Sequence, residues 1–209
     1  MTGYVSTTQM KVQPISYSSN SLVDDQTNTT DSPIKTKLDS WYQNNLTSYT
    51  SYLADTTFCN DRSISFGSGY LTSPTTIYGA YDRLQDRTTP SLKCSQENDR
   101  FKVSSESAKL NYPIGLILAD EVALAGGRTG LANSNYYLYN GKTFWTLSPA
   151  YFGSASSDAS ILVLMSSGNL NSWSRVTYSQ MVRPVINLKQ SITISKGDGT
   201  PLNPFTILS

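Results

Sequence analysis

Carboxylates are the main side chains here that could do chemistry, because the chain contains no histidine. Histidine is the usual general base, proton shuttle and metal ligand near neutral pH, so catalytic serine triads and the common zinc sites are excluded. Asp120 and Glu121 are adjacent, but they stand where a short helix is expected to begin. Acidic residues there serve as a cap and as partners of the helix dipole. We therefore predict no catalytic residues and a protein that is not an enzyme.

Two acidic segments could offer oxygen ligands to Ca²⁺, namely Asn60-Asp61 and residues 97–99. The same residue types are typical of turns in which Asn or Asp side chains bond to the backbone, and we favour that interpretation. The segment 197–199 matches part of a calcium loop but lacks the later acidic ligands. We predict no metal site and no cofactor.

The two cysteines, Cys59 and Cys94, are too far apart for a CxxC redox or zinc motif. They form either one disulfide or two buried thiols, and the sequence leaves both open. A disulfide would close a loop of about 36 residues and contribute roughly 3 to 4 kcal/mol. The surrounding Ser, Thr and Asn favour an extracellular setting.

Charge excludes further classes of function. The 209 residues carry 16 basic and 15 acidic side chains, a formal net charge of +1. This balance argues against a nucleic-acid partner and against a polybasic membrane anchor. No run approaches the 18 apolar residues of a membrane span, so we expect no membrane insertion by this segment. The length fits one domain, here residues 32–209, preceded by an arm, residues 1–31.

Aromatic and small polar residues are concentrated between residues 133 and 178. Tyr and Trp give large contact area at low entropic cost, and Ser and Asn give adaptable hydrogen bonds, as in antibody paratopes. Alternation places Tyr137 and Tyr139 on one face and Tyr136 on the other. The predicted ligand-binding residues are Tyr136, Tyr151, Phe152, Ser154, Ser156, Asp158, Asn169, Asn171, Trp173 and Tyr178. Those expected to be exposed in or beside turns are Tyr151, Phe152, Asn169, Asn171 and Trp173.

The elements that must position these residues begin with a helix. Ser32 can cap it and Pro33 fits its first position, with Ile34, Leu38 and Tyr42 on one face. In the arm, residues 12–17 suggest an edge strand. Residues 72–107 read as a long, charged, irregular stretch.

The second half of the chain is expected to be mostly strand. Residues 112–118 read as a buried strand, followed by a helix over 121–125 that Asp120 caps. Asn140-Gly141 predicts a hairpin over 135–147, since this dipeptide favours tight turns between strands. A second hairpin is expected over 161–176. Further strands are expected over 182–188, 192–194 and 205–207, which gives an α+β fold.

Three motifs follow one another along the chain: YPIGLILADEVALAGG, an aromatic segment ending in FWTLSP, and VRPVINL. Their order resembles the C-type lectin-like fold of gut-bacterial surface and phage proteins, and the resemblance covers about residues 32–189. It implies two helices flanking a small twisted antiparallel sheet with long loops. The ligand surface is then built by loops and hairpins before the closing strand, the region that proteins diversified by retroelements vary. Residues 113–127 are also similar to a strand-to-helix element of the formylglycine-generating-enzyme branch.

The chain lacks the functional motifs of both families that it resembles. The Glu-Pro-Asn, Gln-Pro-Asp and Trp-Asn-Asp motifs of calcium-dependent lectins are absent. The late cysteine pair of the enzyme branch is absent too, since the last cysteine is Cys94. The resemblance thus implies an adhesin or receptor-binding domain on a bacterial surface or phage virion, with a cell-surface protein or glycan as partner. A pilus or virion-decoration domain and an enzyme of the same fold are the alternatives.

Overall fold

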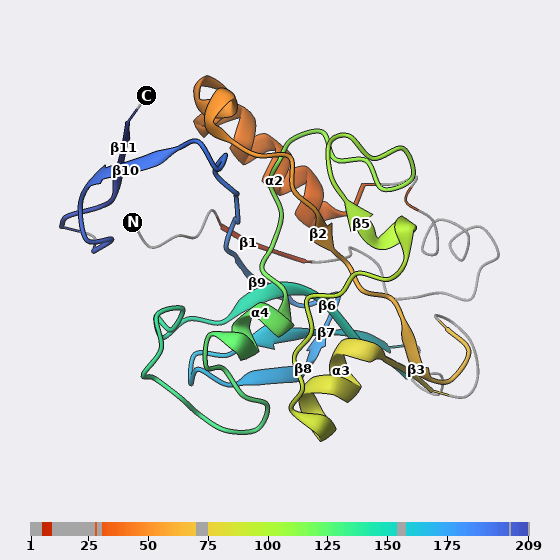
Figure 1. The fold of residues 1–209 in the computed structure, drawn as a ribbon. Helices are drawn as coiled ribbons and strands as arrows, with labels where there is room; N and C mark the ends of the chain where they lie inside the picture. Colours follow the sequence, from red (N-terminus) through yellow and green to blue (C-terminus); the bar gives the residue numbers. More distant parts are fainter. Residues whose placement is uncertain are drawn as a thin grey trace.

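The computed structural model describes residues 6–9, 28, 31–69, 75–153, 158–200 and 202–208 (Figure 1). Its helices are α2 (Pro33–Asn45), α3 (Gly79–Asp82) and α4 (Ala119–Leu124), with short segments of other helix types at Thr47–Tyr52, Arg83–Arg87 and Glu97–Asp99. Its strands are β1 (Ser6–Gln9), β2 (Phe58–Cys59), β3 (Ile64–Phe66), β4 (Thr76–Tyr78), β5 (Arg100–Phe101), β6 (Phe144–Gly153), β7 (Asp158–Leu164), β8 (Leu170–Arg175), β9 (Ser179–Val182), β10 (Thr193–Lys196) and β11 (Thr206–Leu208).

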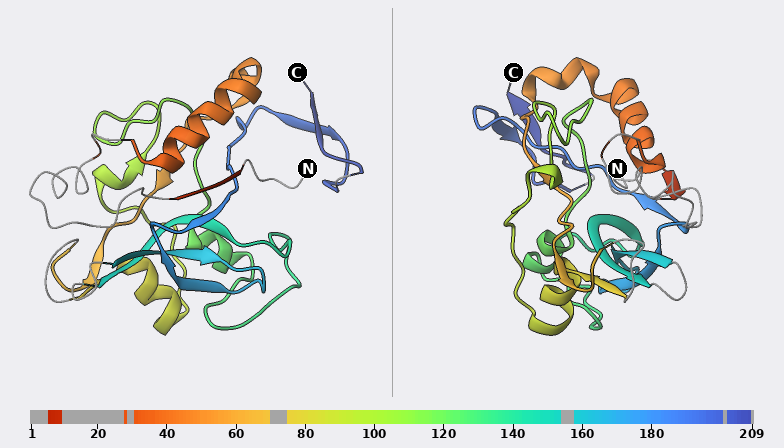
Figure 2. Two further views of the ribbon diagram at one scale, coloured as in Figure 1. Left: turned by 180° about the vertical axis from the view of Figure 1, so that it is seen from behind. Right: turned by 90° about the vertical axis from the view of Figure 1, so that its right-hand side faces the viewer.

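The main sheet has seven strands and is almost entirely antiparallel. Its order is β1-β9-β6-β4-β3, with β7 paired to β6 and β8 paired to β7. Two-stranded pairs are formed by β2 with β5 and by β10 with β11, and the β10–β11 hairpin projects from the body (Figures 1 and 2). The protein is therefore an α+β protein with few helices, as the sequence predicts.

Strand β7 is buried on both faces because its side chains alternate between two cores. Ile161 and Val163 join a core with α2, whereas Leu162 and Leu164 join a core with α3 and α4. Side chains of a strand alternate between faces, so the helices cover opposite sides of the sheet (Figure 2). The two layers of helix fix the position of β7 and of the turn that follows it.

Helix α2 begins where the sequence predicts. The Ser32 hydroxyl accepts a hydrogen bond from the Lys35 backbone N–H at 3.3 Å, and Pro33 occupies the first turn. Ile34, Leu38 and Tyr42 are buried. None of the described helices is long and apolar enough to span a bilayer.

Two strand predictions are wrong. Residues 112–118 are buried around Ile114 and Leu116, but they form only an isolated bridge between Gly115 and Val185. No hairpin forms over 135–147, because residues 132–143 are irregular and β6 pairs with β7 instead. Pairing of buried side chains across two strands outweighs the local turn preference.

Several predictions near the termini have mixed outcomes. Residues 12–17 lie outside the described residues, and the edge strand that is described, β1, pairs with β9. The expected strand over 182–188 is instead β9, which ends at Val182. The last hairpin has strands at Thr193–Lys196 and Thr206–Leu208, close to the prediction.

A half-buried arginine joins three segments that are distant in sequence. Arg83 donates from Nε and one terminal nitrogen to the two carboxylate oxygens of Asp120, at 3.1 and 2.9 Å. Its other terminal nitrogen donates to Asp61 at 2.8 Å. Asp120 also accepts the Ser91 N–H at 2.8 Å. The prediction that Asp120 caps α4 is therefore wrong, and the Glu121 carboxylate takes that role by accepting the Leu118 N–H at 2.8 Å.

The charged stretch over 72–107 is ordered by such contacts where it is described. Arg62 donates to Asp99 from Nε at 2.6 Å and from its backbone N–H at 2.8 Å. Cys59 and Cys94 form a disulfide, which settles the alternative left open by the sequence. The two acidic segments are thus occupied by arginines, with Asp61 also accepting the Ser63 N–H as expected of an Asx turn.

Replacing Arg83 by Met should lower the free energy of unfolding by about 3 to 5 kcal/mol, because it leaves two largely buried carboxylates without a counter-charge. Arg87 offers a matched control on the same helical turn, since its side chain is 66% exposed while it pairs with Asp82 at 2.7 Å. Arg87→Met should cost about 0 to 1 kcal/mol. Urea denaturation of both variants checks this, and equal losses would contradict the role given to Arg83.

Candidate functional site

The predicted ligand-binding residues lie at two separate ends of the β7–β8 hairpin. Asn169 lies in the turn between the strands, and Asn171 follows it in β8; both are half-buried, so the prediction that they are exposed is wrong. Tyr151 and Phe152 lie at the far end, beside the start of β7, and Tyr178 lies in the turn after β8. A strand of this length spans about 20 Å. These residues therefore do not make one continuous surface.

At the far end, the prediction that Phe152 is exposed is wrong. Its side chain is fully buried, because β6 is an inner strand there and Phe152 pairs with Thr76 on β4 and with Ala159 on β7. Tyr151 is half-buried, and its ring meets the edge of the Tyr81 ring at a centroid distance of 6.4 Å. Core packing accounts for both rings.

The remaining residues at this end are described only in part. Ser154 and Ser156 lie outside the described residues. Asp158 and Trp173 lie in strands, but their side chains are outside the described part of the chain, so their exposure stays a prediction. Tyr178 is 48% exposed, with the Arg175 guanidinium 6.0 Å from the centre of its ring.

At the other end, a long loop between α4 and β6 lies against the hairpin turn. We call residues 128–143 the tyrosine loop. The Asn133 N–H donates to Ser167 O at 3.2 Å, and the Tyr136 hydroxyl donates to Gly168 O at 2.9 Å. The start of the loop is fixed as well, since Leu170 N–H donates to Arg128 O at 2.9 Å.

Two further contacts attach the tyrosine loop to neighbouring elements. The Asn133 amide donates to Gly126 O, just after α4, at 2.9 Å. Arg183, just after β9, donates to Leu138 O at 2.9 Å and lies 5.2 Å from the centre of the Phe144 ring. The loop is thus irregular in secondary structure but fixed along its length.

Gly168 allows the loop and the turn to approach this closely. Its φ is +83°, and a Cβ there would clash with the Asn133 carbonyl oxygen. Only glycine accepts both the left-handed backbone and the contact.

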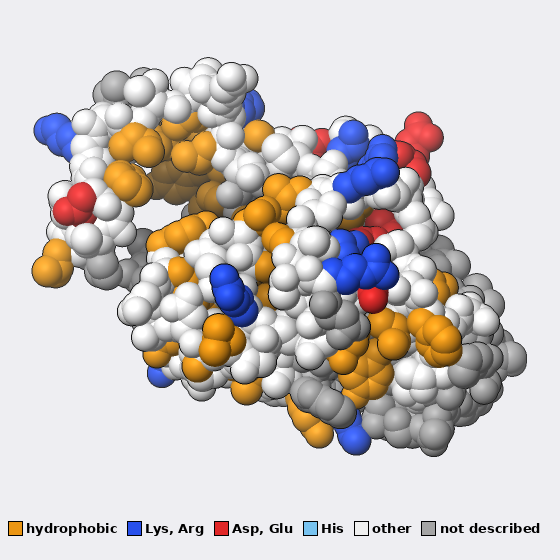
Figure 3. All heavy atoms as spheres, turned by 60° about the horizontal axis from the view of Figure 1, so that its bottom comes forward, with side chains coloured by type: hydrophobic (Ala, Val, Ile, Leu, Met, Phe, Trp, Pro, Cys, Tyr) orange, Lys and Arg blue, Asp and Glu red, His pale blue; other side chains and the backbone are white. Residues whose placement is uncertain are grey.

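The tyrosine loop presents its outer side chains to solvent. Tyr137 is 81% exposed and Leu131 is 55% exposed. The charged residues of the loop are Arg128 and Lys142, both exposed. Around them lie exposed small polar residues, which are Ser134, Asn135, Asn140, Ser166 and Ser167. On the face that Figure 3 brings forward, uncharged groups predominate and hydrophobic side chains form scattered patches among them.

The predicted alternation of side chains holds only in part, and the strand does not form. Tyr137 is exposed and Leu138 is buried, but Tyr139, which the alternation places on the face of Tyr137, is half-buried like Tyr136. Our site prediction included Tyr136 and missed Tyr137 and Leu131. Burial raises the pKa of Tyr136 to about 12, partly opposed by the positive charge of Arg183. Tyr136 therefore positions the loop as a neutral hydroxyl donor.

The comparisons with known proteins identify no relative: no family model, curated protein or solved structure matches the chain. Among the described residues, no group of three or more His, Cys, Asp or Glu side chains could hold a metal ion.

Removing the Tyr136 hydroxyl should destabilise the protein by about 1 kcal/mol, because the Gly168 carbonyl loses a hydrogen bond. The comparison is Tyr136→Phe against Tyr137→Phe, measured by urea denaturation near pH 7. The exposed Tyr137 hydroxyl should contribute less than about 0.5 kcal/mol. Equal effects would show that the Tyr136 contact does not fix the loop.

The difference between wild type and Tyr136→Phe should also shrink above pH 10. The unfolded phenol ionises near pH 10, whereas the folded one keeps its proton until about 12. Stability from this group is therefore complete below pH 10 and is lost as the pH rises toward 12. A difference that stays constant from pH 8 to pH 12 would contradict this assignment.

Proposed function

We propose that this protein is a non-enzymatic binding domain with a C-type lectin-like fold, and that the tyrosine loop contacts a protein or glycan on a cell surface. The observation that carries the proposal is Tyr137, which is 81% exposed on a backbone tied to the sheet by hydrogen bonds. On a fixed backbone, a tyrosine side chain has few torsion angles to order when it binds, so its contact area converts efficiently into affinity.

The surroundings of Tyr137 support recognition by contact and hydrogen bonding. Seven exposed residues of the loop and turn are Ser, Asn, Leu or Tyr, and two are cationic, Arg128 and Lys142. A few aromatic anchors surrounded by adaptable polar groups are typical of binding interfaces. The extracellular location proposed for the domain is consistent with the Cys59–Cys94 disulfide, since such bonds persist mainly in oxidising compartments.

The lectin-like fold is supported by the order of sequence motifs and by the architecture around the sheet. Helices α2 and α4 pack on opposite faces of an antiparallel sheet, and long loops precede the closing strand β9. The proposal that this domain is diversified by a retroelement has a further requirement. A near-copy of the gene segment, differing at adenines, must lie beside a reverse transcriptase gene.

A structural role in an assembly is the second proposal, and the β10–β11 hairpin favours it. Ile194 and Phe205 are both more than half exposed there, and two-stranded hairpins are only marginally stable alone. An oligomer that protects these two side chains, with no ligand for the tyrosine loop, would favour this role.

Tyr137→Ala should weaken binding at least tenfold, because aromatic anchors typically contribute about 2 kcal/mol or more. The measurement is a screen of the full chain on glycan and cell-surface protein arrays, followed by titration of the hits. The matched control is Tyr49→Ala, since Tyr49 is also exposed, at 53%, but lies on the turn after α2. The thermal midpoint of both variants should match wild type.

Hits that bind Tyr137→Ala as tightly as wild type would contradict the assignment of the tyrosine loop. Loss of binding in Tyr49→Ala alone would move the site to the other end of the molecule.

A further inference from the structure

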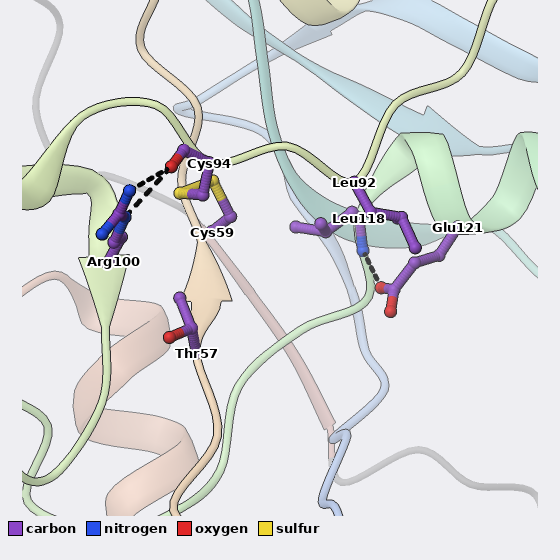
Figure 4. A pocket seen from close by; sticks show the side chains of 7 residues that line it. All are labelled: Thr57, Cys59, Leu92, Cys94, Arg100, Leu118 and Glu121. Carbon is purple, nitrogen blue, oxygen red and sulfur yellow. Dashed lines mark hydrogen bonds between the residues drawn. A yellow bond between two sulfur atoms is a disulfide. The ribbon is translucent and has the colours of Figure 1, made fainter.

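Two adjoining pockets open beside the disulfide, away from the residues of the tyrosine loop. The first has a volume of about 370 Å³ and the second about 130 Å³. Both are lined by Thr57, Leu118 and Glu121, so they form one groove, which we call the disulfide groove. Leu92, Leu118 and Glu121 lie on one side of the first pocket, and the disulfide, Thr57 and Arg100 lie on the other (Figure 4).

The charge of the groove is negative at Glu121. One carboxylate oxygen accepts the Leu118 N–H at 2.8 Å. No Lys or Arg in the described part of the chain forms an ion pair with this carboxylate. Arg100 is neutralised locally, because it pairs with Glu97 at 2.9 Å and donates to Cys94 O. A carboxylate that lines both pockets thus lacks a counter-charge.

The walls of the groove add an apolar contact. Leu92 is 57% exposed and lines the first pocket with Leu118 and the disulfide sulfurs.

We propose that the disulfide groove binds a primary alkylammonium group, as carried by a lysine side chain or by the amino terminus of a partner polypeptide. An ammonium has three donors and a single positive charge, which match the Glu121 carboxylate. The methylenes of the stem contact Leu92 and Leu118, as lysine stems do on apolar surfaces. The groove acts independently of the tyrosine loop, with which it shares no residue.

The test uses n-butylammonium chloride as probe, with n-butanol and sodium chloride as controls, in amide NMR titrations of the full chain. We expect saturable shifts at Thr57, Leu118 and Glu121 with a millimolar Kd, and at least fivefold weaker binding of butanol. Two peptides then separate the sources: acetyl-Ala-Lys-Ala-amide carries only a lysine ammonium, and Ala-Ala-Ala-amide only a terminal one. Binding of either peptide supports the proposal and names the source.

Glu121→Gln keeps an oxygen acceptor for the Leu118 N–H but removes the charge, so it should weaken butylammonium binding at least fivefold. Glu106→Gln makes the same change of net charge at an exposed residue outside the groove and should leave the Kd within twofold. Equal binding of butanol and butylammonium by wild type would overturn the proposal, and this holds even if Glu121→Gln fails to fold. Unchanged affinity in a folded Glu121→Gln, or no shift with any probe, would also overturn it.

Discussion

The ion pair between Arg83 and two buried carboxylates is the constraint on which the rest of the structure depends. Asp120 lies inside α4 and Asp61 lies after β2, so one guanidinium holds a helix, a strand segment and the turn after α3 together. Buried charges are tolerated only when they are paired and hydrogen-bonded. Any other arrangement of these long segments would leave charges unpaired in the interior.

Because Arg83 fixes α4 through Asp120, it also fixes the two candidate surfaces that adjoin this helix. Its N-terminal turn places Glu121 in the disulfide groove, and its C-terminal end leads through Gly126 into the tyrosine loop. On the other side of the loop, the buried strand β7 fixes the turn at Gly168 that receives the Tyr136 hydroxyl. The two surfaces differ in chemistry: one presents an exposed aromatic ring, and the other a carboxylate that pairs with no Lys or Arg of the described residues.

The sequence predicts elements whose signals are local. Helix α2 has its cap, its first-turn proline and its apolar face within a few residues, and the β7–β8 hairpin has its turn at Gly168. Signals that depend on distant partners mislead. Asn140-Gly141 suggests a hairpin, but β6 finds β7 as its partner, and Phe152 becomes an inner-strand residue that no local pattern marks as buried.

The candidate site shows the same contrast between local sequence signals and contacts with distant residues. Composition predicts a binding region over residues 133–178, but Tyr137 becomes the exposed ring only because Tyr136 and Leu138 are anchored by Gly168 and Arg183. Likewise, Asp120 has the sequence position of a cap, and only the approach of Arg83, 37 residues earlier, gives it another role.

The central claim is that the tyrosine loop is rigid although it lacks regular secondary structure. Native-state amide hydrogen exchange tests it most directly, because protection reports local opening. The account predicts slow exchange for the amides of Asn133, Tyr139 and Leu170, which donate to Ser167, Tyr136 and Arg128. Exchange of all three amides at the rate of an unstructured peptide, while the β7 amides stay protected, would contradict it.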